Sequence, residues 1–252
     1  MDISKETILQ QLFSTSTEIS AEIDKRYSKE IDYISEELAV YYKTLKEIID
    51  RGEEDQAKIS DADFQSALLF WTGLNTYLSA VELFRKGYTK EPPMLIRNVL
   101  ETISAAYDIH IHPEKLTNIG RFTKNFDSKK SINIVKKISP LIAKTWGMLS
   151  GNFSHVSYIH TMPNMSAPVC IGGIYDPKHQ VETVLGVLPS LMVTLDLIGS
   201  VIELSFIKEL QSLRFWEMKS HGIYENTFPD RNRKMTQELL SQMSVEIQKI
   251  RS

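Results

Sequence analysis

The first part of the chain contains a long series of apolar residues that recur every three or four positions. Its members are Ile19, Ile23, Tyr27, Ile31, Ile34, Leu38, Tyr41, Leu45 and Ile48. Eight steps lead from position 19 to position 48, so the mean step is 29/8, or about 3.6 residues, which is the helical period. Most positions between them are Glu, Lys or other polar residues. The pattern predicts one long amphipathic helix over about 16–51.

More helices are predicted downstream. Asp61 suits the N-cap of a helix that ends near Gly87. The residues expected on its buried side are Phe64, Leu68, Trp71, Leu74, Leu78 and Val81. Pro92 and Pro93 suit the first turn of the next helix, because the N–H groups that prolines lack would have no helical partner there. A further helix is expected to begin at Pro140.

The last third of the chain includes one stretch that does not fit a helix. Residues 161–179 hold three prolines and a Gly-Gly pair, so we expect a short hairpin or an ordered loop there. A long apolar helix is expected over about 181–212, a loop over 221–232 and an amphipathic C-terminal helix over about 232–251.

Strand-like alternation is nearly absent, and no repeat or linker divides the chain. The sequence therefore predicts an all-α fold. We expect one domain over 1–252, a mostly antiparallel helical bundle with its core at about 61–212 and one non-helical excursion or hairpin near 161–179.

A polar stripe runs along the helix predicted after Pro93. Arg97, Glu101, Ser104 and Asp108 recur at steps of four, three and four, so a helix places them on one face. They could form a solvated face, where an exposed Arg–Glu pair contributes only about 0.3–0.5 kcal/mol. They could also be buried, because apolar residues around most of the remaining circumference are typical of a central helix.

A second polar group follows in "LSGNFSH", at 149–155. An Arg-x3-Glu pair in an apolar helix, followed tens of residues later by Leu-Ser and a histidine, resembles a set of all-helical prokaryotic domain families of unknown function. The matching positions are Arg97, Glu101, Leu149, Ser150 and His155, and the similarity covers about 68–160. The resemblance implies an all-helical domain whose polar residues meet inside the bundle, and it implies no particular reaction.

We therefore expect Arg97, Glu101, Ser150 and His155 to converge as ligand-binding residues. Arg97 could hold a phosphate or carboxylate through two N–H groups, with Glu101 compensating its charge. His155 could carry a proton near neutral pH, so His155 and Glu101 are the candidate catalytic residues. The same four residues could equally form a closed hydrogen-bond network that fixes the packing.

One further pair of residues resembles a nuclease signature. Arg214 and His221 are separated by six residues, a spacing similar to that of the HEPN group of helical RNases. That family usually has a polar residue after the arginine, whereas Phe215 stands there in this chain. The resemblance implies RNA cleavage without a metal, by a toxin or defence factor.

No metal or cofactor site is predicted. His110 and His112 are two residues apart and would point apart on a helix, and no further ligands are apparent. The paired Glu-x-x-His motif of di-iron bundles, the Walker loop, the dinucleotide fingerprint and the nucleophile elbow are also absent from the sequence.

Charge is small in total and uneven along the chain. The net charge is −3, so nothing attracts the whole molecule to nucleic acid or anionic lipid. Residues 121–144 hold seven bases and one acid, a net +6, while residues 18–55 hold twelve acids and six bases, a net −6. The basic segment could guide a phosphate-bearing ligand, remain a solvated face, or contact the acidic helix of another subunit. Only Phe122 and Phe126 are aromatic there, so nucleic-acid binding is weakly supported.

The single cysteine, Cys170, suits a reducing cytoplasm, and the N-terminus has no signal-peptide pattern. The apolar run at 183–207 is long enough to span a membrane but contains Asp196 and Glu203. These two carboxylates share one side of a helix with Gly199 and Ser200, so a buried helix of a bundle is favoured over a membrane span.

Two functions remain open at this point. The first is a cytoplasmic binding or regulatory domain, associated with defence or stress, that takes a small anionic ligand in an internal polar pocket around Arg97, Glu101 and His155. The alternative is a metal-independent HEPN-like RNase or a phosphate-ester hydrolase; catalysis is left undecided. The N-terminal helix is expected either to pack along the bundle or to form a homodimer.

Overall fold

The computed structural model describes residues 4–54, 59–116, 127–153, 181–210, 212–220 and 223–227, with residues 234, 237, 238 and 241. The elements in chain order are α1 (Lys5–Gln10), a π-helix η1 (Gln11–Thr15), α2 (Ser16–Arg26), α3 (Ser28–Glu54), α4 (Asp61–Arg85), α5 (Glu91–Ile111), a short 3-10 helix η2 (Pro113–Lys115), α7 (Ser128–Val135), α8 (Pro140–Phe153), α10 (Val181–Ser205), β1 (Trp216–Ser220) and β2 (Ile223–Asn226). The predicted all-α fold is confirmed.

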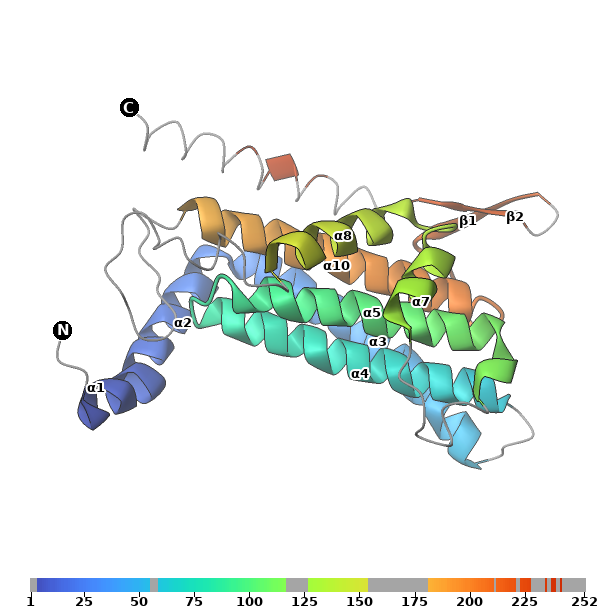
Figure 1. Cartoon of the computed structure of the whole chain (residues 1–252), viewed down its shortest axis with the longest axis horizontal. Helices are drawn as coiled ribbons and strands as arrows, with labels where there is room; N and C mark the ends of the chain where they lie inside the picture. Colours follow the sequence, from blue (N-terminus) through green and yellow to red (C-terminus); the bar gives the residue numbers. More distant parts are fainter. Residues whose placement is uncertain are drawn as a thin grey trace.

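Four long helices, α3, α4, α5 and α10, lie along the long axis of the molecule (Figure 1). Helix α5 packs against α4 and α10 within this bundle, and against α7 and α8 on its other side. The buried apolar side chains of all these helices form one continuous core. Helix α5 is therefore the central helix that its apolar composition predicts.

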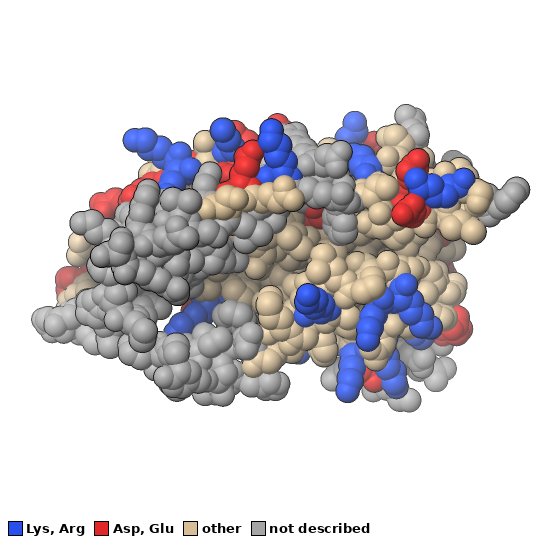
Figure 2. Space-filling model, turned by 90° about the horizontal axis from the view of Figure 1, so that it is seen from above, with Lys and Arg blue, Asp and Glu red and all other residues tan. Residues whose placement is uncertain are grey.

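Helix α7 covers one part of α5 and turns its charged side outward. Ser131, Ile132 and Val135 are its buried residues, whereas Lys129 and Lys130 are exposed. Figure 2 shows Lys and Arg side chains gathered over this part of the surface with little acidic colour among them. The amphipathic pattern of α7 thus places its two lysines, which belong to the basic segment of the sequence, on the outside.

The long helix predicted over about 16–51 is in fact two helices, which is a correction. Tyr27 has φ −114° and ψ 32°, outside the helical region, and α2 and α3 run in different directions on either side of it (Figure 1). The break lets the Tyr27 ring pack on α4, with its centroid 6.2 Å from that of Phe84. Apolar periodicity continues through position 27, so it could not reveal the break.

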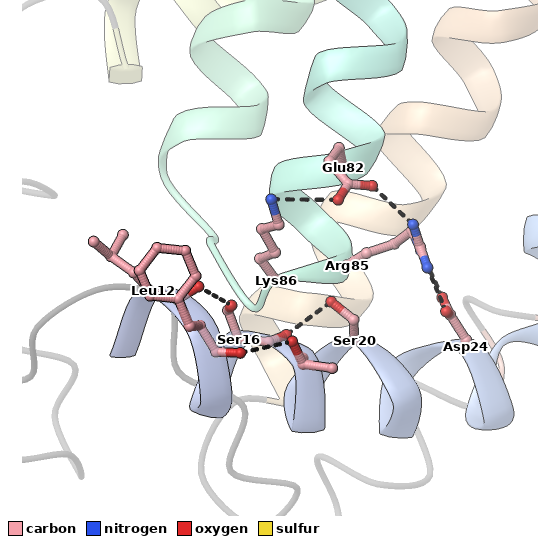
Figure 3. A network of polar contacts seen from close by, with 9 residues as sticks. Leu12, Ser16, Ser20, Asp24, Glu82, Arg85 and Lys86 are labelled. Carbon is pink, nitrogen blue, oxygen red and sulfur yellow. Dashed lines mark hydrogen bonds and ion pairs between the residues drawn. The ribbon is translucent and has the colours of Figure 1, made fainter. Parts of the chain in front are cut away.

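A polar network holds α2 against the end of α4 (Figure 3). The Arg85 guanidinium donates to Asp24 on α2, with Nε 2.7 Å from Oδ1, and to Glu82 on its own helix at 2.8 Å. The hydroxyls of Ser16 and Ser20 donate to the carbonyls four residues before them. These hydroxyls are hydrogen-bonded to the preceding turn of their own segment. Among the described residues, the Asp24–Arg85 ion pair joins α2 to α4.

The boundaries of α4 and α5 follow the local signals closely. Ser60, not Asp61, is the N-cap of α4, and its hydroxyl accepts from the N–H of Asp63 at 3.1 Å. Gly87 after α4 has φ 80°, which favours glycine. Pro92 and Pro93 lie in the first turn of α5, as expected.

Helix α10 ends at Ser205, earlier than the predicted limit of about 212. The chain turns at this point and buries Phe206, whose ring packs on Phe70 and on the His110 ring. The segment Val187–Ser205 is long and apolar enough to cross a membrane, but 83% of it is buried inside the bundle. This burial is what the sequence predicted for a helix with carboxylates on one side.

Among the described residues, β1 and β2 form an antiparallel hairpin. Strands β1 and β2 pair Trp216 with Asn226 and Glu217 with Glu225, with an irregularity after Met218. The sequence was expected to form a loop at 221–232, so that expectation is wrong for residues 223–226. The segment 161–179, where a hairpin was expected, and most of the C-terminal helix predicted at about 232–251 lie outside the described residues.

Candidate functional site

The polar stripe of α5 faces α7 and α8 rather than solvent. Ser104 is fully buried, and the side chain of Asp108 is only 3% exposed. Arg97 and Glu101 are half-buried, with side-chain exposures of 32% and 18%. The interpretation of the stripe as a solvated face is therefore wrong, because α7 and α8 pack over it.

Arg97 and Glu101 form one cluster with two side chains of α8. The Arg97 Nη2 lies 2.8 Å from Glu101 Oε1, and Arg97 Nε donates to Ser150 Oγ at 3.0 Å. The indole N–H of Trp146 donates to the same Glu101 Oε1 at 2.8 Å. The guanidinium carbon also lies 5.9 Å from the centroid of the Trp146 ring, within cation–π range. We call these four residues the Arg97 cluster.

The helical period of α8 explains why Trp146 and Ser150 reach α5 together. They are four residues apart, so they share one face of the helix. Ile142 and Leu149, both nearly inaccessible, anchor that helix in the core beside them. Sequence reasoning singled out Ser150 and missed Trp146, although the spacing of four was available as a signal.

Arg97 is held in one orientation while part of its hydrogen-bonding capacity remains unused. Ser150 and Glu101 bind Nε and Nη2, and no partner for Nη1 is found among the described residues. Glu101 keeps a hydrogen bond from Trp146 whether or not Arg97 turns toward another group. A partly exposed guanidinium fixed in this way can bind a carboxylate or phosphate without first losing much side-chain freedom.

The structure thus brings together three of the four residues expected to converge, Arg97, Glu101 and Ser150. His155 lies in segment 154–180, outside the described residues. Its place beside the Arg97 cluster, and with it the candidate catalytic role of His155 and Glu101, stays a prediction.

Asp108, at the other end of the stripe, lies in a closed set of contacts. Its carboxylate accepts one hydrogen bond from Ser131, at 3.0 Å, and another from Lys115. It also lies 2.9 Å from His112 Nδ1. These partners come from α7 and from the chain just after α5. Asp108 therefore ties three segments together at the end of α5.

The two histidines at the end of α5 have separate partners. His110 Nδ1 lies 2.6 Å from Asp63 on α4, whereas His112 contacts Asp108. Among the described residues, no group of three or more His, Cys, Asp or Glu side chains could hold a metal ion.

A second polar cluster, which sequence reasoning did not predict, lies between α3 and α10. The Arg214 guanidinium donates to both oxygens of Glu37, at 2.9 and 2.7 Å, and its Nε is 3.6 Å from Glu203. Tyr41 donates to Glu37 at 3.0 Å. The backbone N–H groups of Arg214 and Phe215 donate to one Glu203 oxygen at 2.9 and 2.8 Å.

Asp196 lies beside this cluster and is 3% exposed. Its carboxyl accepts a hydrogen bond from Tyr33 at 3.1 Å. Burial raises the pKa of Asp196 to about 7, and the nearby charge of Glu37 acts in the same direction, against the Tyr33 hydrogen bond and Arg214. Burial also raises the pKa of Glu203 despite its backbone donors. At neutral pH, Asp196 is therefore close to half-protonated.

The HEPN-like pair is placed only in part. Arg214 lies just before β1, with its guanidinium bonded to Glu37, so in this arrangement it holds the chain after α10 against α3. His221 lies outside the described residues. The nuclease interpretation stays a prediction from sequence.

Comparison with known proteins gave no match: no family model, no curated protein and no solved structure is similar to this chain. The resemblance to helical families of unknown function therefore stays an expectation.

Proposed function

We propose that the protein is a binding domain that takes a small anionic ligand, a phosphate or a carboxylate, at Arg97. One observation carries the proposal: the Arg97 guanidinium is fixed by Glu101, Ser150 and the Trp146 ring while it stays about one-third exposed. A planar guanidinium binds such anions through two parallel N–H donors.

The arrangement also supports a regulatory role for the ligand. Arg97 is on α5, and the side chain that accepts from its Nε, Ser150, is on α8. A ligand that draws the guanidinium away from Ser150 would remove this contact between the helices, while Glu101 still accepts from Trp146 of α8. Ligand binding and the position of α8 would then be linked, as in other two-state interfaces.

The remaining parts of the sequence-based proposal are consistent with this one and need their own tests. We place the protein in the cytoplasm on the strength of its single cysteine. If the protein is instead a phosphate-ester hydrolase, Glu101 and His155 are the groups expected to transfer protons; His155→Ala would then abolish hydrolysis of a phosphate ester or RNA without unfolding the chain.

The binding proposal is tested by titrating the full chain with inorganic phosphate and with pyrophosphate at low ionic strength, using calorimetry. Arg97→Gln should weaken binding at least tenfold, and Arg97→Lys should recover only part of it because an ammonium lacks the planar fork. Arg85→Gln is the matched control, since Arg85 is 31% exposed and also ion-paired, at the far end of α4. Equal losses in Arg97→Gln and Arg85→Gln, or no binding of either anion, would contradict the proposal.

A further inference from the structure

The outer surface of α7 and α8 carries a concentration of positive charge that the Arg97 cluster does not use. Its members are five exposed lysines: Lys129, Lys130, Lys136, Lys137 and Lys144. We call them the α7–α8 lysine surface. The described residues 127–153 contain one acid, Asp127, so the net charge of this stretch is 5 − 1 = +4 in a chain whose total is −3.

These lysines come from two helices and the turn between them. Lys129 and Lys130 lie in α7, Lys136 and Lys137 follow its last residue, Val135, and Lys144 lies on α8. The opposite side of α7, with Ile132 and Val135, is buried in the core. Figure 2 shows the result as a group of basic side chains, whereas basic and acidic side chains are mixed at the opposite edge of that view.

Only one of the five lysines has an acidic partner among the residues that the structure describes. Lys130 Nζ lies 3.3 Å from Asp127 on the same helix, and both side chains are at least half-exposed. The other four lysines make no ion pair within the described part of the chain. A row of solvated ammonium groups with few internal partners is suited to an extended polyanion, whose bound counterions are released on contact.

Other features of the surface decide which polyanion is favoured. Trp146 is half-buried beneath Arg97, so among the described side chains of these two helices no exposed ring is available for unpaired bases to stack on. The exposed large apolar residues of α8 are Leu141 and Met148, which offer little to an acyl layer. Contacts to a phosphate backbone need neither an exposed aromatic ring nor an apolar surface. In a duplex the bases are already paired, so a duplex is favoured over a single strand.

We propose that the α7–α8 lysine surface binds the phosphate backbone of a nucleic-acid duplex without reading its sequence. None of the five lysines belongs to the Arg97 cluster, so this proposal does not depend on anion binding there. Backbone contacts by five lysines predict a log–log slope of affinity against salt of about −4.5, which is about a 500-fold loss between 50 and 200 mM salt.

The test measures binding of the full chain to a mixed-sequence 20-bp DNA duplex, to the matching RNA duplex, to single strands and to anionic vesicles over a range of salt. Lys129→Gln/Lys136→Gln/Lys137→Gln should lower the slope to about −1.8, leaving about a twelvefold loss over the same salt range. The control triple variant Lys25→Gln/Lys29→Gln/Lys43→Gln removes the same charge from exposed positions of α2 and α3 and should behave as wild type.

The expected result is binding to at least one duplex that only the α7–α8 variant weakens. Binding to both duplexes would show that the surface recognises the phosphate backbone of either helix. Binding to only one would show whether it prefers the DNA or the RNA form. The proposal is overturned by no duplex binding at 50 mM salt, by equal losses in both triple variants, or by preference for single strands or for vesicles.

Discussion

At the scale of single residues, Asp196 is a buried carboxyl whose surroundings change its titration. It lies on α10, and the groups that face it are Tyr33 and Glu37 from α3, Arg214 after α10 and, more weakly, Tyr77 from α4. In the folded chain its pKa is raised to about 7. In the unfolded chain the pKa returns to about 3.9.

This difference predicts how stability depends on pH. Between about pH 4 and pH 7 the folded state binds more protons at Asp196 than the unfolded state, so the free energy of unfolding falls as pH rises and levels off above about 7. Asp196→Asn removes this titration, keeps an acceptor for Tyr33, and should make the chain more stable than wild type at pH 8, by on the order of 2–4 kcal/mol. Urea unfolding of the wild type and of Asp196→Asn at pH 5, 6, 7 and 8 measures this difference in the free energy of unfolding.

Asp32→Asn is the control for this prediction, because Asp32 is an exposed carboxyl of α3. It should leave the pH profile of the wild type unchanged. If Asp196→Asn is less stable than wild type at pH 8, or if its stability falls with pH as the wild type's does, then Asp196 is not the group that titrates.

Local spacing predicted residue contacts only where the partners are close in sequence. The Arg97–Glu101 pair follows from a spacing of four, and the addition of Ser150 rested on a resemblance rather than on geometry. Glu37 and Arg214 are 177 positions apart, and nothing in the sequence pattern around either residue indicates that they meet. Long-range pairs depend on how the helices pack, which one sequence does not specify.

At the scale of elements, Gly199 decides how closely α10 approaches its neighbours. A Cβ at this position would overlap the Tyr41 hydroxyl and ring and would lie 2.6 Å from Phe215. Both side chains are buried, and Tyr41 is also hydrogen-bonded to Glu37, so neither can move aside freely. The absence of a side chain at 199 is therefore a packing requirement.

Gly199→Ala should destabilise the fold by about 2–4 kcal/mol, because the overlap outweighs the gain of about 1 kcal/mol in helix propensity. Gly147→Ala is the matched control on α8, where no neighbouring heavy atom lies within 4 Å of the added carbon, and it should stabilise by up to about 1 kcal/mol. Equilibrium unfolding in urea measures both. Equal and small effects at the two positions would show that α10 can shift to accept the methyl group.

Periodicity predicted most elements, and it failed where a helix has neighbours on more than one side. For α3, the apolar series matches the buried residues almost throughout. For α4, the predicted Leu78 is 48% exposed while Tyr77, one position earlier, is fully buried. Tyr77 reaches the Leu191 carbonyl of α10 at 2.9 Å, so the polar end of a large side chain decides which way the helix faces.

At the scale of the whole molecule, the N-terminal arm is the least covered part of the described chain. Four large apolar side chains of α1 and η1 are 42–73% exposed: Ile8, Leu9, Leu12 and Phe13. Helix α1 has no buried residue, and it projects from one end of the bundle (Figure 1). Exposed apolar groups clustered in this way are typical of an association surface.

The predicted homodimer is tested on this arm. Leu12→Gln/Phe13→Gln should weaken self-association at least tenfold in sedimentation velocity measured over a range of concentrations, because two large apolar side chains leave the contact. Leu78→Gln on α4 removes a similarly exposed leucine and should leave association unchanged. A wild-type chain that stays monomeric at every concentration would show that the prediction is wrong.

The all-α fold could be predicted because helical periodicity and cap residues act locally. The contact between the early helix α3 and the segment after α10 could not be predicted in this way. Glu37 on α3 and Arg214 after α10 are ion-paired in the second polar cluster. The hairpin that follows Arg214 has little of the apolar alternation that predicts strands. The polar contacts that join these distant segments are thus not indicated by local sequence patterns.

Glu203 has a consequence for which substitutions the chain can accept. Its carboxylate is bonded to main-chain N–H groups at 214 and 215, and every residue except proline supplies such a group. The side chains at those two positions can therefore vary without breaking this anchor, whereas position 203 needs a carboxylate of that length. In a saturation mutagenesis library, we expect survivors at 203 to be rarer than at 214, and proline to be the least tolerated residue at 214 and 215.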